Sequence, residues 1–136
     1  MRRSMTLAAA MMTITPAIAA TPGTSPGSSV PVMVRAETEL DACGSLAEVG
    51  GLNARGQNYL SLRRGPASTY DETARLGSGT RVLVCEEREG WLGVLVVPQE
   101  GVHVCAVDQP ARGGHAYRGR CRSGWVSQKY VRDLAG

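Results

Sequence analysis

Four cysteines carry the clearest chemical signal in this chain of 136 residues: Cys43, Cys85, Cys105 and Cys121. A structural zinc site favours close pairs such as Cys-x-x-Cys, and these cysteines are widely separated. An even number of cysteines in a small exported domain instead predicts two disulfides. Three pairings are possible. We favour Cys105 with Cys121, which closes a local excursion, and Cys43 with Cys85, which ties the N-terminal segment to the rest. We expect no metal and no cofactor.

Few other groups could catalyse a reaction. The two histidines, His103 and His115, lie in one Gly-rich stretch, without a nucleophile elbow or an orienting carboxylate beside them. If all four cysteines are oxidised, none remains as the nucleophile of a Cys-His pair. The neighbouring carboxylates Glu86, Glu87 and Glu89 fall in a predicted turn, where solvated charge is the ordinary explanation. We therefore predict that the protein is not an enzyme.

The N-terminus predicts export. Two arginines precede an apolar run over residues 5–14, and a small-x-small cleavage site ends at Ala19. The apolar run has about half of the roughly 20 residues that a membrane-spanning helix needs. Residues 40–43 resemble a lipid-attachment motif only loosely. We expect a signal peptide over residues 1–19, no membrane anchor after its cleavage, and a periplasmic or secreted protein.

The net charge gives no reason to expect nucleic acid as a partner. The whole chain carries a formal charge of +3, but two of its fifteen basic residues belong to the predicted signal peptide. The mature chain is therefore close to neutral. Its basic residues gather late in the sequence, at Arg112, Arg118, Arg120, Arg122, Lys129 and Arg132. A solvated surface explains this distribution, and a basic face for an anionic polymer is the alternative.

The patterning predicts strands and no sustained helix. Residues 20–36 are rich in Pro, Gly, Ser and Thr, so we expect a flexible tether there. Residues 37–57 are expected to form an N-terminal extension packed on a barrel. Strand-like runs then follow at 59–62, 81–86, 91–97, 120–126 and 130–134.

The strands predict an all-β fold in which residues 58–136 form a small five-stranded barrel. Residues 63–80 form an irregular excursion after the first strand. A Gly-rich insertion at 98–119 precedes the fourth strand, and a short strand-like piece at 102–107 lies within it. Residues 127–129 suit one 3₁₀ turn before the last strand.

Four segments in this order resemble one known family. They are residues 60–68, the Gly-Thr before Val82, the run Gly90-Trp91-Leu92, and Gly124-Trp125-Val126 followed by Tyr130-Val131. Together these segments resemble a bacterial Src-homology-3-like (SH3b) domain, over roughly residues 58–134. The cysteine positions are similar to those of small secreted single-domain members with four cysteines. The resemblance implies an SH3-like barrel, and the insertion at 98–119 departs from the tight hairpin usual in the family.

The resemblance also implies where a ligand would bind. In eukaryotic relatives of this fold, aromatic residues on the first loop, after the charged turn and on the 3₁₀ turn form a shelf for extended Pro-rich peptides. The matching residues are Tyr70, Trp91 and Tyr130, and we add the nearby Arg122 as a candidate. Trp91 and Tyr130 could equally belong to the core. Trp125 is expected to fill the core.

Bacterial members of the family are commonly associated with cell-wall peptides. We therefore predict an exported, non-catalytic binding module for cell-wall peptide or glycan, with peptidoglycan as its partner. The alternative is a protein-interaction or inhibitor module that contacts a periplasmic or extracellular protein through the insertion at 98–119.

Overall fold

The computed structural model describes residues 10–16, 27–35, 43–107 and 114–135. These residues form an all-β structure, as predicted, with nine strands and two 3₁₀ helices. The elements are β1 (Met33–Val34), β2 (Ser45–Val49), β3 (Leu60–Arg63), β4 (Glu72–Leu76), β5 (Arg81–Arg88), β6 (Trp91–Val96), η1 (Val102–Cys105), β7 (His115–Ala116), β8 (Ser123–Ser127), η2 (Gln128–Tyr130) and β9 (Val131–Ala135). Among the described residues, no helix is long and apolar enough to cross a membrane.

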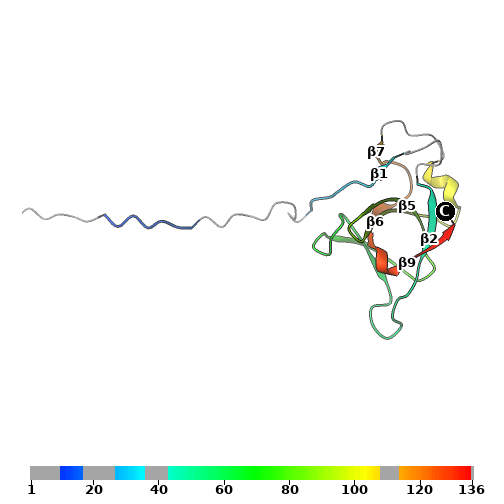
Figure 1. The fold of residues 1–136 in the computed structure, drawn as a ribbon, viewed down its shortest axis with the longest axis horizontal. Helices are drawn as coiled ribbons and strands as arrows, with labels where there is room; N and C mark the ends of the chain where they lie inside the picture. The colour runs from blue at the N-terminus through cyan, green and yellow to red at the C-terminus, as the bar shows by residue number, and fades with distance from the viewer. Residues whose placement is uncertain (1–9, 17–26, 36–42, 108–113, 136) are drawn as a thin grey trace, which may run out of the picture.

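Seven of the strands form one curled antiparallel sheet in the order β4-β3-β8-β6-β5-β2-β9 (Figure 1). The other two, β1 and β7, form a small separate sheet. Strands β5 and β6 make the longest hairpin, joined by Glu89 and Gly90 at φ 47° and 85°. Two positive φ angles are typical of the two-residue turns that match the twist of a hairpin. Within the described residues no pairing joins β4 to β9, so the sheet is not closed by hydrogen bonds.

The five predicted strands correspond to β3, β5, β6, β8 and β9, but the described residues form four further strands that we did not predict. Strand β2 comes from the segment expected to be an extension packed on the barrel, yet it lies inside the sheet, between β5 and β9. Its buried residues Ala47 and Val49 alternate, but the small alanine and the glycines that follow hide this period in the sequence. Strand β4 lies in the excursion expected to be irregular and pairs with β3. The strand-like piece at 102–107 forms the 3₁₀ helix η1 instead.

Two hydrophobic clusters occupy the two faces of the central strands. One fills the inside of the curled sheet and consists of Ala47, Val49, Leu60, Leu62, Leu76, Val82, Leu92, Val94 and Val126. The other, which we call the outer cluster, consists of Val32, Val34, Cys43, Leu83, Leu95, Cys105, Cys121 and Trp125. Adjacent residues such as Val82 and Leu83 enter different clusters because successive side chains of a strand point to opposite faces.

The outer cluster is covered in part by the N-terminal segment 27–35. We expected this segment to belong to a flexible tether, but Val32 and Val34 are each only 2% exposed. The indole Nε1 of Trp125 donates a hydrogen bond to the carbonyl oxygen of Val30, and the Tyr117 amide donates to that of Val32. Alternating valines supply the apolar surface that the Pro, Gly and Ser composition concealed. The other tether residues, 20–26 and 36, lie outside the described residues, as do residues 1–9 and 17–19 of the predicted signal peptide.

Both predicted disulfides are confirmed. Cys43 is joined to Cys85 on β5, and Cys105 at the end of η1 is joined to Cys121, shortly before β8. No cysteine of the chain is free. Two disulfides are compatible with an oxidising compartment outside the cytosol.

Candidate functional site

A pocket of about 510 Å³ lies between the β3–β4 hairpin and the insertion that follows β6. We call it the arginine pocket, because three of its lining side chains are arginines. Its lining residues are Ala74, Arg75 and Leu76 on β4, Val96 and Pro98 at the end of β6, Glu100, His103 and Val104 around η1, and Arg120, Cys121 and Arg122 before β8. Apolar side chains and charged ones therefore meet in one cavity.

The insertion side of the pocket is held by two links between η1 and the segment before β8. The first is the disulfide between Cys105 and Cys121. The second is the Tyr117 hydroxyl, which donates to the Cys105 carbonyl oxygen at 2.8 Å and accepts from the Cys121 amide at 3.1 Å. The Val96 amide also donates to the Arg122 carbonyl oxygen at 2.8 Å, which ties the segment to β6. This side of the pocket is therefore preorganised.

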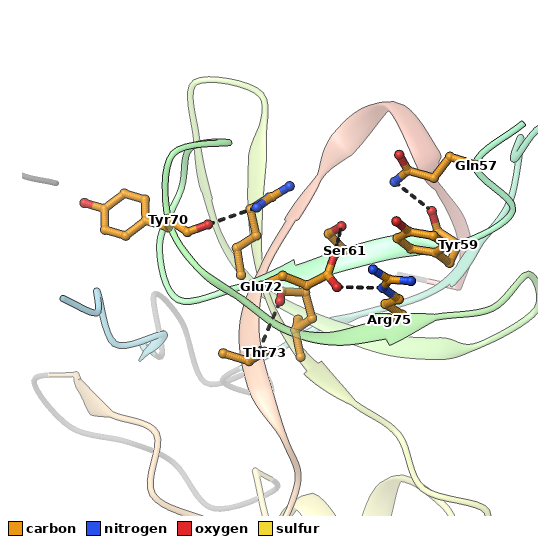
Figure 2. A network of polar contacts seen from close by, with 9 residues as sticks. Gln57, Tyr59, Ser61, Tyr70, Glu72, Thr73 and Arg75 are labelled. Carbon is orange, nitrogen blue, oxygen red and sulfur yellow. Dashed lines mark hydrogen bonds and ion pairs between the residues drawn. The ribbon is translucent and has the colours of Figure 1, made fainter. Parts of the chain in front are cut away.

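A polar network on the hairpin positions Arg75 on the opposite side (Figure 2). Its Nε donates to Glu72 Oε1 at 2.7 Å, and its guanidinium lies over the Tyr59 ring, 4.2 Å from the centroid. The Ser61 hydroxyl donates to Glu72 Oε2. These contacts hold Arg75 beside the pocket, and the Glu72 carboxylate balances much of its positive charge.

The hydrogen bond from Arg75, with a second one from Ser61, lowers the pKa of Glu72 below its ordinary value. The same bond to Glu72 raises the pKa of Arg75. Both groups are therefore charged at neutral pH.

Arg120 and Arg122 differ from Arg75 in having no carboxylate partner among the described residues. Both side chains are exposed. The acidic residue that lines the pocket is Glu100, so positive charge is in excess there. Guanidinium groups present several N–H donors in a fixed plane, which suits carboxylate oxygens. The pocket is therefore equipped to bind an anionic group beside apolar surface.

The site residues predicted from the sequence do not lie together in the structure. Arg122 lines the arginine pocket, whereas the three aromatic residues do not. Tyr70 is half-buried, its ring lies close to Gly65, and Figure 2 shows it at the loop end of the hairpin, away from Arg75. Trp91 packs against the outer cluster, and Tyr130 packs against the cluster inside the curled sheet.

Most of the pocket's charged residues were missed by sequence reasoning. A signal existed for Arg120, which with Arg122 brackets Cys121 in the arginine-rich late segment. None existed for Arg75, because only the pairing of β3 with β4 brings it to the cavity. His103, considered only as a catalytic group, also lines the pocket, while His115 is exposed on β7.

The described residues contain no group of three or more His, Cys, Asp or Glu side chains arranged to hold a metal ion. Comparison with protein-family models, with curated proteins and with solved structures found no match in any of the three.

Proposed function

We propose that this protein is an exported, non-catalytic binding module with an SH3-like barrel, and that its ligand is cell-wall peptide or glycan. Support for the barrel comes from the seven-stranded sheet, which has a strand at each of the five predicted positions, namely β3, β5, β6, β8 and β9. The 3₁₀ helix η2 directly precedes β9 in sequence. The segments that resemble SH3b domains lie on β3, β5, β6 and β8 to β9. Export is supported by the N-terminal sequence and by the two disulfides.

The observation that carries the proposal is the arginine pocket. Its lining combines apolar side chains with Arg120 and Arg122, which have no carboxylate partner among the described residues. Small cavities with apolar walls and a few placed polar groups are the usual form of ligand sites. Cell-wall peptides carry carboxylates and small apolar side chains, which match these two features. The peptide part of the wall therefore fits the pocket better than its neutral sugars do.

Sedimentation with purified peptidoglycan tests the proposal. We expect the oxidised protein to sediment with the wall, and the double variant Arg120→Ala/Arg122→Ala to remain largely in the supernatant. The matched control is Arg64→Ala/Arg81→Ala, which removes two exposed arginines that do not line the pocket. Wild-type protein that stays in solution would overturn the proposal. Equal loss of binding in the control would assign the effect to overall charge.

The alternative is a protein-interaction or inhibitor module that uses the insertion at 98–119, of which residues 108–113 lie outside the described residues. The segment that would make this contact is η1, which is held by a disulfide and carries Val102, a large apolar side chain that is 45% exposed. The test is capture of a periplasmic protein that Val102→Asp abolishes while Val102→Ala retains part of it. Capture unchanged by Val102→Asp would exclude this surface.

A further inference from the structure

The arginine pocket opens beside an unpaired strand edge. Strand β4 is the last strand of the sheet on one side, and among the described residues its backbone hydrogen bonds go to β3 alone. An edge strand presents backbone N–H and C=O groups that an extended chain can pair with. Residues 74–76 of β4 also line the pocket. A peptide that pairs with this edge and ends beside residues 74–76 would therefore place that end in the pocket.

The charges of the pocket select which end enters. A peptide's C-terminus is a carboxylate, and Arg120 and Arg122 are two guanidinium groups without a carboxylate partner in the described structure. Arginine binds a carboxylate through two parallel N–H donors, and these charge-assisted bonds are stronger than neutral ones. An N-terminal ammonium would meet the same arginines and be repelled.

The remaining lining residues restrict the ligand further. Leu76, Val96, Val104 and the buried Cys121 form an apolar surface suited to a small apolar last side chain. Glu100 adds one negative charge to the lining, which opposes a ligand with several negative charges, such as a phosphate polymer. Arg75 is already bound to Glu72, so the arginines left for a ligand number two among the described lining residues.

We propose that the arginine pocket binds the free C-terminal carboxylate of an extended peptide with a small apolar last residue, while the peptide backbone pairs with the outer edge of β4. This inference rests on the proposed binding function and specifies its ligand. The Cys105–Cys121 disulfide and the Tyr117 hydroxyl are positioning groups, because they hold the segment that carries both arginines.

Two peptides that differ only at the C-terminus provide the test. The probes are acetyl-Ala-Gly-Ala-Gly-Ala with a free carboxylate and the same peptide with a C-terminal amide. Titration of the ¹⁵N-labelled oxidised protein, followed by NMR, reports affinity and contact residues together. We expect the acid to bind about tenfold more tightly than the amide or better, which corresponds to the loss of at least one charge-assisted bond. Amide shifts should lie on β4 and around residues 120–122.

The arginine variants sharpen this test. In Arg120→Ala/Arg122→Ala the acid should lose its advantage over the amide, while Arg64→Ala/Arg81→Ala should keep it. Equal binding of acid and amide to the wild type would overturn the inference, and so would inorganic phosphate that displaces the acid peptide at equal concentration. If neither peptide binds but the protein still sediments with peptidoglycan, this inference is wrong and the proposed function stands. If sedimentation fails as well, both are wrong.

Discussion

The indole Nε1 of Trp125 donates a hydrogen bond to the carbonyl oxygen of Val30 at 2.7 Å, joining residues 95 positions apart. The ring is fully buried and Val30 is half-buried, so the bond gives the buried indole N–H the partner that it needs. It fastens the N-terminal segment across the outer face of the sheet. The predicted core role of Trp125 is confirmed, but its partner is a segment that the composition marked as a tether.

Replacing Trp125 with Phe should destabilise the protein, because the hydrogen bond to the Val30 carbonyl oxygen is lost and the smaller ring leaves space at a fully buried position. We expect a loss of about 1–3 kcal/mol in the free energy of unfolding, measured with urea. Hydrogen exchange should accelerate at the Tyr117 amide, which donates to the Val32 carbonyl oxygen. Trp91→Phe is the control, because Trp91 is only half-buried. A uniform rise in exchange throughout the sheet would contradict a local role for this bond.

Removing the Cys105–Cys121 disulfide by a double substitution with Ser should also lower stability. Its cysteines are 16 residues apart, for which the chain-entropy model predicts roughly 3 kcal/mol. The pocket should lose more order than the sheet, since the Tyr117 hydroxyl would then be the described link that remains between η1 and residue 121. Urea unfolding measures the first effect and binding of the acid peptide the second. Unchanged peptide affinity would show that the disulfide does not position the arginines.

Gly124 occupies a position where a methyl group does not fit. A Cβ there would lie 2.9 Å from the carbonyl oxygen of Arg63 and 2.8 Å from the Leu62 side chain. Gly124→Ala should therefore cost about 1–3 kcal/mol through overpacking between β3 and β8. Gly77→Ala is the matched control, because nothing lies within 4 Å of its added Cβ and its φ is not positive. An equal decrease of the thermal unfolding midpoint in both variants would refute the packing argument.

Glu72 should have a pKa below that of an ordinary glutamate, because its ionised form accepts hydrogen bonds from Arg75 and Ser61. A lowered pKa in the folded state means that its contribution to stability is present above the ordinary pKa of 4.5 and is lost as the pH falls through the lowered value. Carboxyl NMR titration measures this pKa directly. In Arg75→Gln it should return toward the ordinary value. In Arg81→Ala it should not move, and a shift there as large as in Arg75→Gln would contradict the pairwise cause.

Local features of the sequence predicted much of the fold. The all-β class follows from short apolar runs divided by turn residues, and it is confirmed. The pairing of Cys105 with Cys121 joins cysteines close in sequence around a small excursion, and both predicted disulfides are confirmed. Strand β4 was missed because Glu72, Thr73 and Arg75 are exposed and leave little apolar alternation to detect.

The candidate site was only partly predictable. Arg122 was named from the sequence, but the aromatic residues taken from the family resemblance lie outside the arginine pocket. The pocket draws on β4, the end of β6, η1 and the segment before β8, which are far apart along the chain. Residue types and local periods do not say which edges of a sheet will face one another.

The sequence by itself indicated the all-β class, the presence of two disulfides and the burial of Trp125, because each depends on local pattern or on a few distinctive residues. It favoured one of three cysteine pairings, and the structure decided for that one. Only the tertiary structure decided that β2 lies inside the sheet, that residues 27–35 cover the outer cluster, and that Arg75 meets Arg120 and Arg122 at one cavity. Those outcomes depend on strand order and on which buried surfaces meet, and both are settled by packing of the whole chain.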